Sequence, residues 1–164
     1  FGYNTSQSTK LSCAAEEVGP EEIKGARILL AEDNKINQQV AVEILTNMGF
    51  SVEVAQDGRE AVDKAIKGNF DAVLMDIQMP ELDGFEASRQ IRQAEEQSRS
   101  KAEPISFTPI LAMTAHAMSE QKQKWLSAGM NEHISKPVEP RALAAALSKW
   151  IKQCAKNRYL VAEN

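Results

Sequence analysis

The chain is poor in the residues that build disulfide frameworks and soft-metal clusters. Among its 164 residues only Cys13 and Cys154 are cysteines, and they lie far apart without the spacing of metal ligands. Long hydrophobic runs are also missing, since the longest apolar stretches are far too short to cross a bilayer, and no signal-peptide pattern opens the chain. These absences argue against a disulfide-stabilised secreted module, and we expect a cytoplasmic location without membrane contact by this segment.

An excess of positive charge is missing as well. The chain has 19 lysine and arginine residues against 23 acidic residues, a formal net charge of -4. Nucleic-acid backbones demand a basic face, so we expect no direct nucleic-acid partner. The hydrophobic fraction of 43% and the charged fraction of 26% are those of an ordinary globular protein with one well-filled core.

Composition divides the chain into three parts. Residues 1–25 are rich in Ser, Thr, Gln and Glu and show no periodicity, which predicts a flexible linker or tail. Residues 26–155 form the predicted domain, and residues 156–164 a short C-terminal tail. No internal repeat is present.

Within the predicted domain, short apolar runs alternate with segments of helical periodicity. This alternation predicts an α/β fold with a parallel sheet covered on both faces. The residues between the third helix and the fourth strand, 98–108, are predicted to be a surface loop. Strands are predicted at 26–31, 51–55, 70–76, 109–114 and 132–135, and helices at 35–48, 57–68, 85–97, 119–128 and from 140 onward.

Four of the predicted strands end on residues that can take part in phosphoryl chemistry. The first strand leads into Glu32 and Asp33, the third ends on Asp76, the fourth ends on Thr114 and the fifth is followed by Lys136. Because the carboxyl ends of parallel strands lie at one edge of a sheet, we expect these side chains to meet there.

The chemistry of this set favours a magnesium site beside a nucleophile. Glu32, Asp33 and Asp76 would repel one another unless a cation neutralised them. A few carboxylates and waters suit Mg²⁺, and one carboxylate can then attack a phosphoryl group to give an acyl phosphate. Lys136 would supply positive charge for the phosphoryl oxygens, and Thr114 a hydroxyl donor.

Four motifs, in order and on the expected strands, resemble the receiver domain of two-component response regulators over about residues 26–152. The resemblance implies a flavodoxin-like (βα)5 doubly wound fold with the strand order 2-1-3-4-5, an order known for folds of this type. The motifs are Leu30-Ala31-Glu32-Asp33-Asn34, Leu74-Met75-Asp76-Ile77-Gln78-Met79-Pro80-Glu81-Leu82-Asp83-Gly84, Met113-Thr114-Ala115-His116-Ala117 and Ser135-Lys136-Pro137.

The resemblance assigns roles around the metal. It implies that Asp76 is the phosphoacceptor and that Asp33 is a direct Mg²⁺ ligand. Glu32 stands where the family often has Asp, and it would act on the metal through water. Gln78 would give its backbone carbonyl to the metal.

The resemblance also assigns a switch. Thr114 resembles the hydroxyl that moves onto the phosphoryl group, Lys136 matches the active-site lysine, and the Lys136–Pro137 bond is implied to be cis. His133 stands where the family's aromatic switch residue is often Tyr or Phe. Simple half-buried packing of His133 is an equal alternative. The stretch 95–108 looks longer than in a minimal receiver.

The expected function is that of a receiver that takes a phosphoryl group from a phosphohistidine onto Asp76 and slowly hydrolyses it. Its partners would be a histidine kinase domain, a histidine phosphotransfer protein or both. The chain holds no kinase ATP-binding motif, and too few residues follow the last predicted helix for a DNA-binding output domain. Output would therefore be a phosphorelay step or a protein contact.

The residues of the first and third motifs, together with the linker-like start, resemble receivers that belong to a hybrid histidine kinase. The chain begins at Phe1 rather than Met, as expected for a fragment of a longer protein. A stand-alone single-domain regulator is the alternative. An aspartyl-nucleophile phosphatase is remote, because Gln78 stands where such enzymes need a second acid. A nucleotide- or flavin-binding domain is also remote, since the first strand is not followed by a glycine-rich loop.

Overall fold

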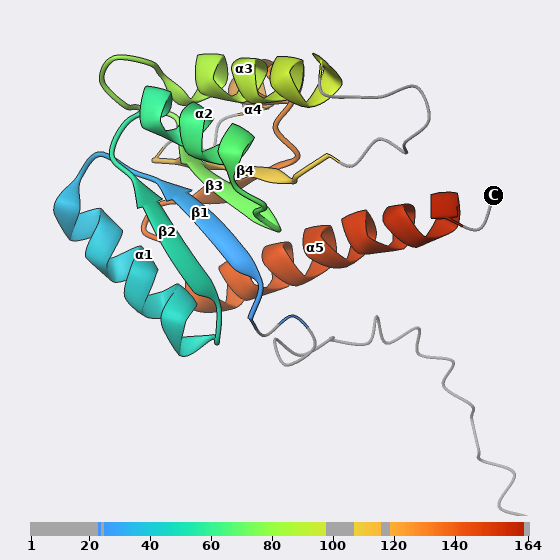
Figure 1. The fold of residues 1–164 in the computed structure, drawn as a ribbon. Helices are drawn as coiled ribbons and strands as arrows, with labels where there is room; N and C mark the ends of the chain where they lie inside the picture. The colour runs from blue at the N-terminus through green and yellow to red at the C-terminus, as the bar shows by residue number, and fades with distance from the viewer. Residues whose placement is uncertain (1–22, 24, 98–106, 116–118, 163–164) are drawn as a thin grey trace, which may run out of the picture.

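Five short strands form one all-parallel sheet in the order β2-β1-β3-β4-β5 (Figure 1). This computed structural model describes residue 23 and residues 25–97, 107–115 and 119–162. The sheet order and the α/β class agree with the sequence-based expectation. The strands are β1 (Arg27–Ala31), β2 (Ser51–Ala55), β3 (Ala72–Asp76), β4 (Ile110–Thr114) and β5 (Glu132–Ser135).

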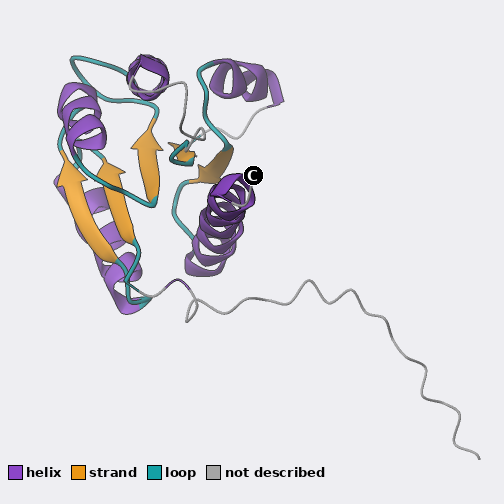
Figure 2. Cartoon of the chain, turned by 45° about the vertical axis from the view of Figure 1, so that its right-hand side comes forward, coloured by secondary structure: helices purple, strands orange, loops and turns teal. Residues whose placement is uncertain are grey.

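Helices cover both faces of the sheet, as the two views of the chain show (Figures 1 and 2). α1 and α5 pack on one face and α2, α3 and α4 on the other, each face with its own cluster of buried apolar side chains. The helices are α1 (Lys35–Asn47), α2 (Gly58–Lys67), α3 (Gly84–Gln97), α4 (Ser119–Ser127) and α5 (Pro140–Ala162).

Alternation along the strands explains why the sheet has two apolar faces. In β1, Ile28 and Leu30 point to the α1 and α5 side, while Leu29 and Ala31 point to the α2 and α3 side. β3 lies between β1 and β4 and is buried along its whole length. Strands buried on both faces need continuous apolar runs, which is the pattern seen in the sequence.

The helix ends follow from local hydrogen bonding. Asn34 caps α1, since its side-chain oxygen accepts from the backbone N–H groups of Ile36 (2.9 Å) and Asn37 (3.2 Å). Asp57 caps α2 in the same way and accepts from the N–H of Glu60 at 2.8 Å, as the capping-box spacing predicts.

Two segments differ from the sequence-based expectation, and the other element bounds agree within two residues. α5 continues to Ala162, although residues 156–164 were expected to be a tail. The residues after Trp150 are mostly helix formers without Gly or Pro, so nothing local ends the helix there.

The start of the chain also contributes to the core. Ile23, inside the expected linker 1–25, is buried in the cluster beneath α1 and α5. The remaining residues of that linker, except Gly25, lie outside the described residues, as do 98–106 of the expected surface loop. The proposed domain boundaries therefore stay a prediction, with Ile23 added to the packed part.

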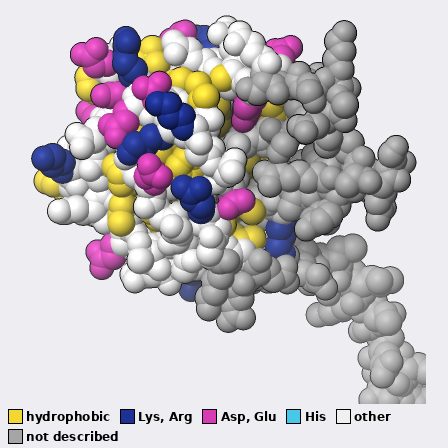
Figure 3. Space-filling model, viewed as in Figure 1, with side chains coloured by type: hydrophobic (Ala, Val, Ile, Leu, Met, Phe, Trp, Pro, Cys, Tyr) yellow, Lys and Arg dark blue, Asp and Glu magenta, His cyan; other side chains and the backbone are white. Residues whose placement is uncertain are grey.

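The surface carries both signs of charge. On the face seen in Figure 3, the basic and acidic side chains of the described residues are interspersed with apolar ones. None of the described helices is long and apolar enough to span a membrane.

Candidate functional site

A cavity of about 280 Å³ lies at the carboxyl ends of β1, β3 and β4. The structure brings together there every residue that the strand-end argument selected, and it adds the polar residues at the start of α1. His133 does not line the cavity. The lining residues are Glu32, Asp33, Asn34, Asn37, Asp76, Ile77, Gln78, Met113, Thr114, Ala115 and Lys136.

The two acids after β1 lie in opposite environments. Glu32 is only 2% exposed, and its Oε1 accepts from the backbone N–H of Asn34 at 3.0 Å. The side-chain amide of Gln38 donates to the Glu32 carbonyl and ties α1 to the end of the strand. Asp33 is exposed. Glu32 is therefore held in place, while Asp33 stays open to a ligand.

Asp76 is the last residue of β3 and is 4% exposed. Its Oδ1 accepts from the backbone N–H of Gln78 at 3.1 Å. The start of α3 presses against its backbone, because a Cβ placed on Gly84 would lie 2.3 Å from the Asp76 carbonyl oxygen. Glycine at position 84 thus allows the helix to begin beside the proposed phosphoacceptor.

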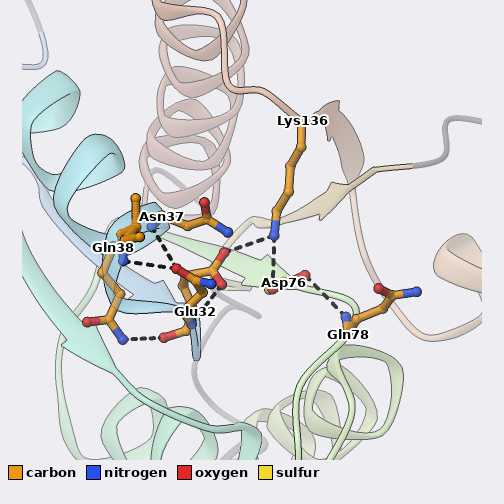
Figure 4. Close-up of polar contacts among 8 residues, drawn as sticks. Glu32, Asn37, Gln38, Asp76, Gln78 and Lys136 are labelled. Atoms are coloured by element: carbon orange, nitrogen blue, oxygen red, sulfur yellow. Dashed lines mark hydrogen bonds and ion pairs between the residues drawn. The ribbon is translucent and has the colours of Figure 1, made fainter.

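Lys136 joins two of the acids. Its Nζ lies 2.9 Å from Glu32 Oε2 and 2.9 Å from Asp76 Oδ2, and Figure 4 shows it between these carboxylates. Burial by itself would lower the pKa of Lys136, but the hydrogen bonds with Glu32 and Asp76 outweigh it and raise the pKa above the ordinary value. Lys136 is therefore positively charged at neutral pH.

The donor set fits a hard divalent cation. One carboxylate oxygen from each of Glu32, Asp33 and Asp76 can be chosen so that all three lie within 4.8 Å of one another. Three carboxylates and one lysine together carry a net charge of -2, which one Mg²⁺ ion would balance. All-oxygen ligands open to water are the kind that Mg²⁺ prefers. The side chain of Gln78 points away from the carboxylates in Figure 4, and the metal role of its carbonyl stays a prediction.

Thr114 and Lys136 are tied together through the backbone. Thr114 ends β4, is 7% exposed, and accepts from the Lys136 N–H through its carbonyl at 2.8 Å. The Lys136–Pro137 peptide bond is cis, as the resemblance implies. The ends of β4 and β5 are therefore joined beside the cavity by this backbone hydrogen bond.

His133 lies on β5 outside the cavity and is exposed. Its ring packs on that of Trp125 from α4, with the centroids 5.3 Å apart and an angle of 44° between the rings. In the β4–β5 register His133 is the partner of Ala112, two residues before Thr114. No sequence pattern predicts the contact with Trp125, and the switch role of His133 stays a prediction.

Sequence reasoning missed the contribution of α1 to the site. Asn34 and Asn37 line the cavity, and Gln38 fixes Glu32 from the same turn. The available signal was the set of carboxamides within six residues of the two acids, at the predicted start of a helix.

Comparison with known proteins identifies the family. The family model of the response regulator receiver domain matches residues 28–148. The chain belongs to this family. The receiver is 36% identical over 163 residues to the hybrid signal transduction histidine kinase I of Dictyostelium discoideum, and this match covers 94% of the chain and 9% of that protein. Across the first five curated relatives, the receiver spans between 7% and 15% of their length.

Solved structures agree with this assignment. The receiver domain of a sensor histidine kinase from Pseudomonas aeruginosa, solved with magnesium in its active-site cleft, is 39% identical with a TM-score of 0.68. The match covers 78% of this receiver and 98% of that chain. The receiver domain of the Saccharomyces cerevisiae regulator Ssk1, solved with the histidine phosphotransfer protein Ypd1, is 33% identical with a TM-score of 0.68, over 77% and 89% of the two chains. Family membership favours a receiver over the phosphatase and nucleotide-binding alternatives.

Proposed function

We propose that this receiver accepts a phosphoryl group from a phosphohistidine onto Asp76 in the presence of Mg²⁺. The observation that carries the proposal is the buried Asp76 carboxylate, 2.9 Å from Lys136 Nζ in a cavity with two further acids. A carboxylate held in this way can act as a nucleophile toward phosphorus.

The transfer needs one bond formed and one broken. A carboxylate oxygen of Asp76 bonds to phosphorus, the P–N bond breaks, and its electron pair stays on the imidazole nitrogen of the donor. Asp33, Asp76 and the Gln78 carbonyl would hold Mg²⁺, with Glu32 acting through water, and the bound ion would supply positive charge that offsets the repulsion between the acids and the phosphoryl group.

Lys136 has a different partner before and after transfer. Before transfer, the lysine forms ion pairs with both Glu32 and Asp76. Once Asp76 is phosphorylated it no longer carries its carboxylate charge, and the strongest anion near Lys136 is the phosphoryl group. Thr114 would follow to the same group, which would shift an existing two-state equilibrium through His133 and alter the surface of α4 and α5.

The relatives favour a place in a hybrid histidine kinase. Several of them are named as hybrid or sensor histidine kinases, and the Ssk1 receiver was solved with a histidine phosphotransfer protein. We propose a histidine kinase domain, a histidine phosphotransfer protein or both as partners, and a cytoplasmic location for the reaction. A native gene product of this size would instead identify a stand-alone regulator, and mass measurement of the intact protein distinguishes the two.

Labelling of Asp76 tests the proposed function. Incubation with a small phosphodonor and Mg²⁺ should add one base-labile phosphoryl group, which intact-mass spectrometry detects. Asp76→Asn should abolish the addition, because the amide is not a nucleophile for this reaction. Asp63→Asn is the matched control, since Asp63 is exposed on α2 outside the cavity. Equal labelling of the Asp76→Asn variant would show that the acceptor lies elsewhere.

A further inference from the structure

The first turn of α1 places two adjacent side-chain carboxamides near the cavity, and only one of them is bound to the fold. Gln38 donates its amide N–H to the carbonyl of Glu32. Asn37 uses its backbone N–H for the cap at Asn34, but its side chain makes no hydrogen bond to the described part of the chain. The carboxamide of Asn37 is thus available to a ligand.

Asn37 lies at the rim of the cavity and the reacting groups lie at its floor. Asp76 and Thr114 are 4% and 7% exposed, whereas Asn37 is exposed and lines the same cavity. In Figure 4 the Asn37 side chain extends from α1 toward Lys136. A donor whose phosphorus has reached Asp76 must therefore leave the rest of its structure at the rim, where Asn37 is one of the exposed lining residues.

We propose that Asn37 contacts the leaving group of the phosphodonor during transfer to Asp76. This inference rests on the proposed function. As the P–N bond breaks, its electron pair stays on the imidazole ring, and a side-chain N–H of Asn37 donates a hydrogen bond to the ring nitrogen distal to phosphorus, because the lone pair of the leaving nitrogen faces phosphorus. Stabilisation of charge that develops only in the transition state lowers the barrier to transfer.

A carboxamide suits this position better than a charged side chain does. An aspartate would add a fourth carboxylate to a cavity that must admit an anionic phosphoryl group. A lysine at position 37 would compete for Glu32 and Asp76 with Lys136, whose Nζ already lies 2.9 Å from both carboxylates. The neutral amide offers a donor without either cost.

The experiment compares transfer with occupancy of the phosphoryl position. Phosphoimidazole with Mg²⁺ measures the rate of labelling, because its leaving group is that of phosphohistidine. Beryllofluoride with Mg²⁺ occupies the phosphoryl position on the acceptor carboxylate and has no leaving group. Asn37→Ala and Asn37→Asp are the test variants, and Gln39→Ala is the control, an exposed residue of the same helix that does not line the cavity.

Asn37→Ala should slow labelling by phosphoimidazole about three- to tenfold, the range for loss of one hydrogen bond. Asn37→Asp should slow it further, because it removes the N–H and adds negative charge. Beryllofluoride affinity should be the same in Asn37→Ala and the wild type, and Gln39→Ala should match the wild type in both assays. Alanine retains the backbone N–H that binds Asn34, so the variant should fold, which circular dichroism checks.

Wild-type labelling together with unchanged labelling of Asn37→Ala would overturn this inference and leave the proposed function intact. A loss of beryllofluoride affinity as large as the loss of labelling rate would also overturn it, because Asn37 would then hold the phosphoryl group itself. Absence of labelling in the wild type would instead refute the proposed function.

Discussion

At the scale of single residues, Lys136 sets the charge balance of the cavity. Its ammonium group lies 2.9 Å from two carboxylates that are almost entirely buried, those of Glu32 and Asp76. Removal of one partner from such a group leaves buried charge uncompensated, which costs more than the pair itself contributes. A metal ion at the same acids would supply the missing positive charge by another route.

Lys136→Ala should therefore destabilise the protein strongly without metal and less with it. We expect a loss of about 2 kcal/mol in the free energy of unfolding, below the range for fully buried pairs because the cavity is open to water. Millimolar Mg²⁺ should recover part of this loss, while phosphorylation-dependent signalling stays absent. Urea unfolding measures the loss of unfolding free energy without Mg²⁺ and with it. An equal loss in the two conditions would contradict the charge argument.

The pH dependence of the stabilisation by Lys136 follows from the direction in which its pKa is shifted. The pKa of Lys136 is raised above its ordinary value of 10.5, so the folded state holds this proton more tightly than the unfolded state. The resulting stability is fully present below about pH 10 and is lost as the pH rises through the folded-state pKa. Between neutral pH and pH 9 the effect of Lys136→Ala should therefore be constant.

The sequence identified which residues meet at the cavity but not how they pair. Strand-end positions placed Glu32, Asp76 and Lys136 at one edge, because the topology of a parallel sheet requires it. The bridging of both acids by one lysine depends on side-chain conformation and burial, which no spacing encodes. The packing of His133 on Trp125 likewise joins two elements whose relative position only the folded chain fixes.

At the scale of elements, Arg92 fastens α3 to the turn between α4 and β5 and to the start of β4. Its side chain is 18% exposed, and its guanidinium donates to four groups. Any Cβ at Gly129, which has φ +87°, would lie 2.6 Å from the Arg92 Cγ, so the turn fits closely around the arginine. The acceptors are the carbonyls of Gly129 (2.9 Å) and Thr108 (2.8 Å), Glu95 Oε2 (2.7 Å) and Asn131 Oδ1 (2.8 Å).

Arg92→Ala should cost about 3 kcal/mol of unfolding free energy, because it leaves several partly buried acceptors without a donor. Arg89→Ala is the matched control on the same helix. Arg89 is half exposed and pairs only with Glu86 among the described residues, so its loss should cost less than about 0.5 kcal/mol. Equal unfolding midpoints for the two variants in urea would show that the Arg92 contacts contribute little.

Element ends were predictable where a local signal exists and not where it is lacking. The caps at Asn34 and Asp57 follow from side chains that accept backbone N–H groups nearby in sequence. α5 has no such signal after Trp150, so its continuation to Ala162 was missed. Burial of Ile23 was also missed, since one apolar residue in a polar segment has no period that marks it.

At the scale of the whole molecule, the sheet concentrates negative charge at one edge. The net charge of the full sequence is only -4, yet three carboxylates lie close together beside a single lysine. Repulsion among these carboxylates opposes folding, because they are far apart in the unfolded chain and are brought together once the strands align. A ligand that binds only the aligned acids must then stabilise the folded state.

Mg²⁺ should accordingly raise the free energy of unfolding of the wild type by about 2.7 kcal/mol at a concentration one hundred times its dissociation constant, and with it the unfolding midpoint. Asp33→Asn should abolish most of this gain, because it removes the exposed acid of the cluster. Without metal the variant should be as stable as the wild type or slightly more so, since Asp33 is exposed and one source of repulsion is gone. Thermal unfolding across a Mg²⁺ titration, with Asp63→Asn as the control, measures the difference, and an undiminished Mg²⁺ response in Asp33→Asn would place the cation away from this edge of the sheet.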